Sequence, residues 1–216
     1  MKKFALIVAA GFIINAITST ALLFPEGNDI KLEKPVSNLN VDLISALENR
    51  KSTRNFSAKP VSPEDLSTIL WAANGINRSD GKRTAPAPMG IYLIQIYVAS
   101  STGTYFYDPS KGVLKFISDK NIKGMVGRQA DIPHASYVLI LTAKLDMLPS
   151  RVNNESKIAM ANATAGCIAQ NVYLTAAALG IGTRIVAGIN IEGITGELKL
   201  VSDEVPLYIM PLGYPQ

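Results

Sequence analysis

Residues 156–179 limit the fold of this chain more than any other segment. The segment is rich in alanine and apolar on almost every side of a helix, and it is interrupted by the amides Asn162, Gln170 and Asn171. A helix of this kind needs cover on several sides, so it belongs in the centre of a domain or in an interface. The amides argue against a membrane span, which the hydropathy alone would suggest.

Shorter signals around this helix predict further regular elements. Ser62 and Pro63, followed by two acids, predict a helix start, because a hydroxyl cap, an early proline and negative charge favour a helix N-terminus. Gly75 ends that helix. Other helices are expected at residues 39–47, capped by Asn38 or Asn40, at residues 119–128, and at residues 190–200, capped by Asn190.

The strands expected between these helices predict an α+β protein. Residues 137–143 form a continuous apolar run of strand length, which suits the interior of a sheet. Asp108, Pro109 and Gly112 predict a hairpin turn. Helices and strands alternate without a strict βαβ rhythm, which is typical of α+β layers. The remaining strands are expected at residues 93–99, 105–107, 113–117, 181–186 and 205–212.

The first residues resemble a targeting segment. Lys2 and Lys3 form a short positive region, an apolar stretch follows, and small residues up to Ala21 suit cleavage by a signal peptidase. We expect export to the periplasm or another extracytoplasmic space; an uncleaved membrane anchor and a buried first helix are the alternatives. The chain then divides into residues 1–21 (signal peptide or anchor), residues 22–38 (linker) and residues 39–216 (one domain).

The composition excludes several classes of function. Hydrophobic residues make up 48% of the chain, the net charge is +4, and the basic residues form no stripe of the kind that binds nucleic acid. A single cysteine excludes an internal disulfide and a cysteine-rich metal site. The apolar neighbours of Cys167 predict a buried, inert thiol, and the lone His134 is expected to be structural. We expect no metal site.

The segment from Arg50 to Arg54 is the first candidate binding element. In an extended chain alternate side chains point to opposite faces, so Arg50, Ser52 and Arg54 would share one face. Together they offer hydrogen-bond donors to a phosphate or a similar anion. The alternative is a solvated run of charges.

Two glycine-containing segments are further candidates. The loop at residues 84–90 holds two prolines and a glycine, which exclude an α-helix and a β-ladder. Its backbone N–H groups therefore remain free for a flat ligand. It can equally be an ordinary connection. Gly180, Gly182 and Gly188 do not have the dinucleotide-binding spacing, but Gly188 precedes a capped helix and can present a bare amide.

Taken in order, these segments resemble the nitroreductase family of flavoproteins. The resemblance runs from about Val41 to the C-terminus and covers some 175 of 216 residues. The loop at residues 84–90 and the end of the helix that begins at Ser62 look closest to the flavin dehydrogenases of thiazole and oxazole peptide maturation. The matching motifs are RKSTRNF, WAANGI, RTAPAPMGIY, SYVLILTA, AGCIAQNVYLTAAALGIGT and YIMPLGYP.

The resemblance implies a homodimeric three-layer fold, with a central, mostly antiparallel sheet, flanking helices and two FMN sites at the subunit interface. Arg50 and Ser52 match positions on the phosphate and ribityl chain, Lys51 a position of mixed contacts, and Arg54 the cation near the pyrimidine end. Two further groups complete the implied site. They are the loop residues Pro86, Ala87, Pro88 and Met89, which lie along the isoalloxazine and come from the partner subunit in many members, and Ala187 and Gly188, which face N5.

The function implied is that of an FMN-dependent oxidoreductase. Hydride passes in a ping-pong scheme through flavin N5, from NAD(P)H or another small donor to a nitroaromatic or quinone-like acceptor, and no protein acid or base is required. Three departures from the family pattern stand out: Met89 and its neighbours replace an asparagine, Ala187 replaces an acid, and no basic tail precedes Gln216. A non-catalytic or degenerate flavin-binding protein and a peptide-ring dehydrogenase are the alternatives.

Overall fold

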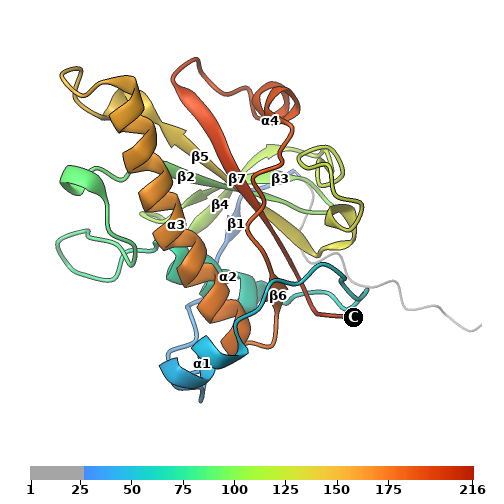
Figure 1. Cartoon of the computed structure of the whole chain (residues 1–216). Helices are drawn as coiled ribbons and strands as arrows, with labels where there is room; N and C mark the ends of the chain where they lie inside the picture. Colours follow the sequence, from blue (N-terminus) through green and yellow to red (C-terminus); the bar gives the residue numbers. More distant parts are fainter. Residues whose placement is uncertain (1–26) are drawn as a thin grey trace, which may run out of the picture.

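The computed structural model describes residues 27–216, and the signal peptide or anchor expected at residues 1–21 lies outside them. Seven strands form one antiparallel sheet in the order β1-β4-β3-β2-β5-β7-β6 (Figure 1). The strands are β1 (Ile30–Lys31), β2 (Ile94–Ala99), β3 (Thr104–Asp108), β4 (Val113–Ser118), β5 (Tyr137–Lys144), β6 (Gly182–Thr183) and β7 (Glu204–Gly213). The helices are α1 (Leu43–Asn49), α2 (Pro63–Asn74), α3 (Asn154–Ala178) and α4 (Ile191–Leu198), with short 3₁₀ turns at Pro88–Gly90, Ile132–His134 and Leu145–Met147. The predicted α+β class is confirmed.

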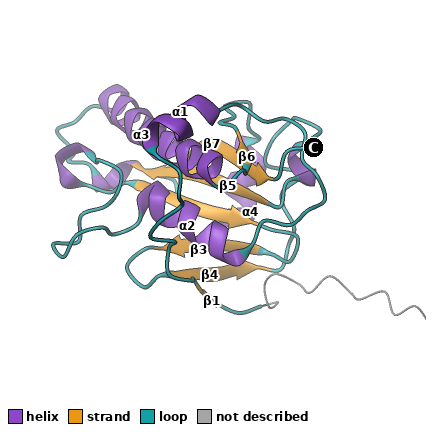
Figure 2. Cartoon of the chain, turned by 90° about the horizontal axis from the view of Figure 1, so that it is seen from below, coloured by secondary structure: helices purple, strands orange, loops and turns teal. Residues whose placement is uncertain are grey.

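The sheet is buried on both faces, which produces three layers (Figure 2). On β5, Leu139 and Leu141 pack into a core shared with α2 and α3, while Val138 and Ile140 pack into a second core shared with α4. Alternate residues of a strand point to opposite faces, so a strand covered on both sides has to be apolar throughout. This explains the continuous apolar run in the sequence.

The predicted helix starts follow the capping rules, with one correction. Ser62 Oγ accepts the Asp65 N–H at 3.0 Å at the start of α2, and Asn190 Oδ1 accepts the Gly193 N–H at 3.1 Å at the start of α4. The cap of α1 is Asp42, not Asn38 or Asn40. Asn38 instead accepts the backbone N–H of Asn40, whose φ of 53° belongs to a turn before the helix.

The helix expected at residues 119–128 is absent; the structure has turns there. Asn121 Oδ1 accepts the Lys123 N–H, a local bond that competes with helix formation. Gly127 passes so close to the core that a Cβ would lie 2.4 Å from Ile132. The apolar residues of the segment, Ile122 and Val126, still pack into the second core. Two apolar residues four positions apart can therefore both be buried without forming a helix.

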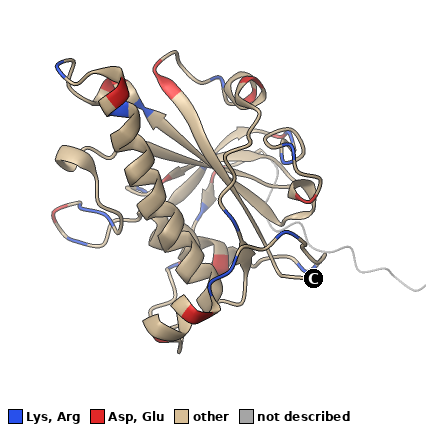
Figure 3. Cartoon of the chain, in the orientation of Figure 1, with Lys and Arg blue, Asp and Glu red and all other residues tan. Residues whose placement is uncertain are grey.

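The long helix α3 presents one face to solvent, and this corrects the interpretation of Cys167. Figure 3 shows α3 almost free of charge beyond its first turns. Cys167 is exposed, because its neighbours Ala165 and Ile168 point into the core while Cys167 faces outward. The exposed positions along this face are Ala159, Ala163, Gly166, Cys167 and Gln170.

Part of the segment expected to be a linker lies against the domain. Ile30 pairs with Leu114, which makes β1 the edge strand beside β4. The Glu33 and Val36 N–H groups donate to hydroxyls of α2, Ser67 and Thr68, at 3.1 and 3.0 Å. Within residues 27–216 no helix has the length and apolar character needed to cross a membrane.

Candidate functional site

The segment from Arg50 to Arg54 leaves α1 in an extended conformation and lies beside β6. Arg50 ends α1 with φ −61° and ψ 119°. Ser52 forms a parallel bridge with Thr183, and the Thr53 N–H donates to the Thr183 carbonyl at 2.9 Å. The predicted extended conformation is therefore present, and a short strand from the C-terminal half of the chain holds it.

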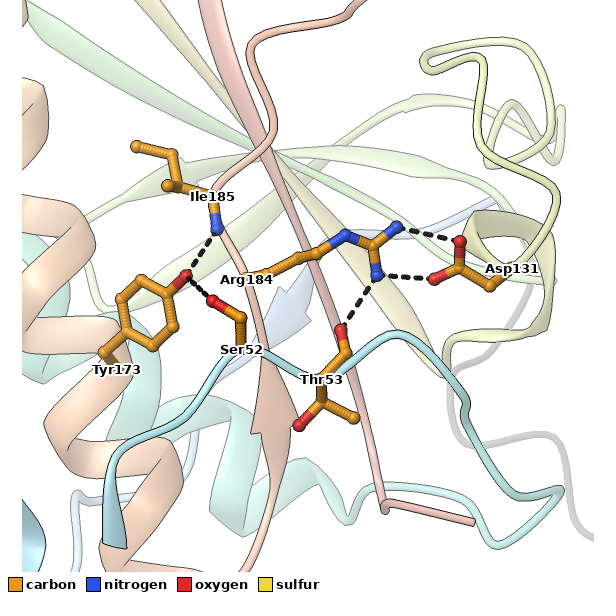
Figure 4. Close-up of polar contacts among 6 residues, drawn as sticks. All are labelled: Ser52, Thr53, Asp131, Tyr173, Arg184 and Ile185. Carbon is orange, nitrogen blue, oxygen red and sulfur yellow. Dashed lines mark hydrogen bonds and ion pairs between the residues drawn. The ribbon is translucent and has the colours of Figure 1, made fainter. Parts of the chain in front are cut away.

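Tyr173 of α3 fixes the side chains of this segment. Its hydroxyl accepts the Ile185 N–H at 2.9 Å and lies 3.0 Å from Ser52 Oγ (Figure 4). The guanidinium carbon of Arg50 lies 5.3 Å from the centre of the Tyr173 ring, in cation–π contact. One side chain thus positions both Arg50 and Ser52.

Arg184 holds the other side of the segment. The residue is only 6% exposed, and its guanidinium donates to the Thr53 carbonyl at 2.8 Å. The same guanidinium forms a bidentate ion pair with Asp131, with Nη2 at 2.8 Å from Oδ1 (Figure 4). Burial tends to raise the pKa of Asp131, but the Arg184 hydrogen bonds and charge, together with the charge of Arg54, hold it below its ordinary value.

Side chains of the segment alternate between two faces, as the sequence predicts. Figure 4 shows Ser52 and Thr53 pointing to opposite sides of the chain. Lys51 and Thr53 line a cavity of about 320 Å³ beside Gly182 and Thr183. In the described part of the chain, Thr183 Oγ1 is buried in the wall of this cavity without a hydrogen-bond partner. A buried hydroxyl without a partner favours a polar ligand or water there.

Arg50 and Arg54 are available to an anion. Neither guanidinium forms an ion pair with a carboxylate of residues 27–216. Arg54 is exposed, and its field reaches Asp131, whose carboxylate is already neutralised by Arg184. The face that carries Arg50, Ser52 and Arg54 therefore keeps a net positive charge.

Ala187 and Gly188 lie exposed in the chain that leads from β6 to α4. In the described residues no protein acceptor takes the N–H of either one. A bridge between Gly127 and Ile189 fixes the segment to the turns before β5. A Cβ on Gly188 would lie 3.2 Å from the Gln129 amide nitrogen, so there is little room for a side chain at this position. The geometry leaves these two amides free to meet a ligand acceptor.

The loop at residues 86–89 is not brought to this face within one chain. It lies on the other side of α3 from the Arg50–Arg54 segment (Figure 1). Met89 is 52% exposed and has a φ of 52° at the centre of the turn Pro88–Gly90. A contact between this loop and a ligand at Arg50 and Arg54 would require a second copy of the chain, as the resemblance implies.

Sequence reasoning missed three residues of the site: Tyr173, Arg184 and Asp131. Two of them carry a usable signal. Tyr173 is the one aromatic residue in the alanine-rich helix, and Arg184 is a charge inside an apolar, strand-like stretch, where a partner is required. Asp131 lies in a segment without periodicity, and only the fold brings it to Arg184.

The fold and the cationic face define a class of protein: an antiparallel α+β domain that presents two guanidinium groups and free backbone amides to an anionic, acceptor-rich ligand. The sequence model described as the nitroreductase family matches residues 47–214. The chain therefore belongs to the nitroreductase family, and it is an oxidoreductase by that membership.

Known proteins agree with this assignment. A protein of Methanocaldococcus jannaschii, provisionally named a nitroreductase, is 31% identical in an alignment 199 positions long that covers 88% of this chain and 93% of that protein. A provisionally named nitroreductase of Ralstonia eutropha JMP134 superposes with a TM-score of 0.82 at 32% identity, over 88% of this chain and 90% of that one. The NADPH:FMN oxidoreductase of Vibrio harveyi, solved with NAD⁺, shares the fold at a TM-score of 0.61 and 19% identity, over 81% of this chain and 69% of that one.

Proposed function

We propose that this oxidoreductase depends on FMN and passes hydride, in a ping-pong scheme, from a small donor to a nitroaromatic or quinone-like acceptor. The observation that carries the proposal is the pair of guanidinium groups, Arg50 and Arg54, which form no ion pair within residues 27–216 and lie on a segment fixed to β6. An anionic ligand is the chemistry that such a face stabilises. Membership in the nitroreductase family supports FMN as that ligand.

The residues present fit a flavin mononucleotide. Arg50 and Ser52 would hold the phosphate and ribityl end, since Tyr173 presents both side chains on one face. Arg54 would lie near the pyrimidine end, with Lys51 as a further contact. The exposed Ala187 and Gly188 amides suit the ring nitrogens and carbonyls, and the loop Pro86, Ala87, Pro88 and Met89 of a second copy would cover the ring.

The flavin supplies the hydride chemistry when bound, and the chain supplies orientation and electrostatics. Arg54 would place positive charge where the reduced ring becomes anionic. The Arg184–Asp131 pair would keep Arg54 and Ser52 in register, because Arg184 holds the Thr53 carbonyl between them. No side chain of this face is required to move a proton.

FMN binding is tested by the visible spectrum of the purified protein and by titration of FMN into the apoprotein. Loss of one charge-assisted hydrogen bond in Arg50→Gln should weaken FMN binding by about one to two decades. Arg151→Gln removes an exposed cation at the other end of α3 and is the matched control. Equal FMN affinity in wild type and Arg50→Gln would contradict the assigned phosphate contact.

Steady-state turnover separates the enzyme from a non-catalytic flavin-binding protein. We expect reduction of a quinone or nitroaromatic with parallel-line kinetics when NADH, NADPH or a chemical reductant is varied against the acceptor. A flavin-loaded protein that reduces no such acceptor with any of these donors would favour the non-catalytic alternative. Turnover only with a peptide-derived heterocycle would favour the peptide-ring dehydrogenase.

Export belongs to the same proposal. The positive, apolar and small-residue pattern of residues 1–21 supports cleavage after Ala21, so that the mature domain acts outside the cytoplasm. Intact-mass measurement of the protein from its native host checks this. A full-length mass in the soluble cytosolic fraction would exclude it.

A further inference from the structure

A second cavity, which shares no residue with the first, lies where β2 ends and β5 begins. Its volume is about 200 Å³, enough for one tetrahedral oxyanion or a few waters at about 30 Å³ each. Lys123 reaches into it from the turns between β4 and β5. We refer to it as the Lys123 cavity. Its wall consists of Ser57, Ala58, Pro60, Ser100, Ser101, Thr102, Lys123, His134, Ala135, Ser136 and Tyr137.

The Lys123 ammonium is buried without a compensating negative charge. The side chain is only 7% exposed, and Nζ donates to the Ala135 carbonyl at 2.7 Å. None of the ion pairs within residues 27–216 includes Lys123, and burial lowers the pKa of its ammonium. An ammonium has three N–H donors, so the Ala135 carbonyl satisfies one of them.

The wall of the cavity has the composition of an anion site. It holds no Asp or Glu, and it carries hydroxyl groups on Ser57, Ser101 and Ser136 as well as the imidazole of His134. A charge taken out of water is costly unless an opposite charge accompanies it. The Ser136 hydroxyl already donates to the Lys59 carbonyl at 3.5 Å. The cavity beside Lys123 leaves space for that opposite charge next to the hydroxyl groups of Ser57 and Ser101, which can donate to it.

We propose that the Lys123 cavity binds a phosphate-sized oxyanion, with the Lys123 ammonium as its charged anchor and the hydroxyls of Ser57 and Ser101 and the imidazole of His134 as further donors. The anion is either free inorganic phosphate or the phosphate end of a larger molecule. The site does not depend on the proposed flavin function, because none of its residues belongs to the Arg50–Arg54 face.

Calorimetric titration of inorganic phosphate, in buffer free of phosphate and sulfate, tests the site. The titrations use full-length Arg50→Gln protein, so that phosphate bound at the Arg50 face does not contribute and failure of the flavin proposal leaves the test intact. We expect binding to one site and a higher unfolding temperature with phosphate. Adding Lys123→Met should weaken binding by at least about tenfold.

Lys111→Met is the matched control, because Lys111 is an exposed lysine in the β3–β4 turn, at the other end of β3. It should leave phosphate binding unchanged. Equal binding in the Lys123→Met and Lys111→Met proteins, or no binding to Arg50→Gln protein at all, would overturn the proposal.

A second variant keeps the test valid if Lys123→Met does not fold. Ala58 is exposed on the cavity wall, so Ala58→Asp can supply an internal carboxylate for Lys123. We expect it to abolish phosphate binding and to raise the unfolding temperature without phosphate. Phosphate binding as in the parent protein would overturn the proposal. Displacement of phosphate by glycerol 3-phosphate would show that the cavity accepts the phosphate end of a larger molecule, and failure to displace it would favour the free ion.

Discussion

A single buried guanidinium, that of Arg184, connects three segments that are far apart in the sequence. It follows β6, holds the carbonyl of Thr53 and pairs with Asp131 ahead of β5. Replacing one member of such an ion pair lowers the free energy of unfolding, because the remaining charge loses its partner inside the protein. The register of the predicted flavin-binding segment therefore depends on a residue outside that segment.

Arg184→Met should destabilise the fold by about 3–5 kcal/mol, since it strands the Asp131 carboxylate and the Thr53 carbonyl. Chemical denaturation measures this loss. The double variant Arg184→Met/Asp131→Asn should lose clearly less than the sum of the two single variants. Strict additivity would mean that the pair contributes no coupling.

Arg54→Gln should act on the reduced flavin more than on FMN affinity. Arg54 keeps its charge for a ligand, because Asp131 is already paired with Arg184. Losing ~1.4 kcal/mol of differential stabilisation lowers a two-electron potential by roughly 30 mV. Equilibration of the loaded protein against a reference dye gives the potential. An unchanged potential, or a loss of FMN affinity as large as that in Arg50→Gln, would refute this division between the two arginines.

At the scale of elements, local chemistry made some parts of the fold predictable. The α2 helix and the β3–β4 hairpin carry their own signals, in the Ser62 cap and in the turn after Asp108. The turns at residues 119–128 were predicted as a helix; Ile122 and Val126 have helical spacing, but tertiary packing and not a helix holds them. The Arg50–Arg54 face was predictable from alternation, whereas its supports Tyr173 and Asp131 come from distant elements.

The β3–β4 hairpin should lose stability in acid through Asp108. Hydrogen bonds from Lys115 and Ser110 lower the pKa of Asp108 from its ordinary value of 3.8 to about 2. Its contribution is therefore complete above about pH 4 and disappears as the pH falls towards 2. The difference in unfolding temperature between wild type and Asp108→Asn should be constant at neutral pH and shrink below pH 4. A difference that stays the same down to pH 2 would exclude this role.

The contact between β6 and the Arg50–Arg54 segment has no spare room. A Cβ on Gly182 would lie 2.6 Å from the Thr53 side chain, so Gly182→Ala should cost about 1–3 kcal/mol and weaken FMN binding. Gly196→Ala in α4 is the control; nothing lies within 4 Å of its Cβ, and it should stabilise by about 0.5–1 kcal/mol. Thermal denaturation and FMN titration of both variants measure this. Equal FMN affinity in both would contradict the dependence on this contact.

At the scale of the whole molecule, the uncovered apolar surface favours a second copy of the chain. Leu43 and Ile44 of α1 are each 63% exposed, and the outer face of α3 carries only small or amide side chains. Together with the family membership, this leads us to expect an obligate homodimer. Ala163→Arg on the outer face of α3 should give monomers that no longer retain FMN, with the mass measured by light scattering and bound FMN by visible absorbance. A wild-type monomer at micromolar concentration with flavin bound would rule out the dimer.

The strand β1 has a practical consequence for handling the protein. Ile30 and Lys31 form the edge strand of the sheet beside β4. The backbone N–H groups of Glu33 and Val36 donate to the hydroxyls of Ser67 and Thr68. A shortened chain that starts at residue 39 would leave the backbone of Val113 and Leu114 in β4 without its partner strand and so lengthen the open edge of β4. Open edges template intermolecular strand pairing, so such a truncation should aggregate during expression even though the Arg50–Arg54 face is intact.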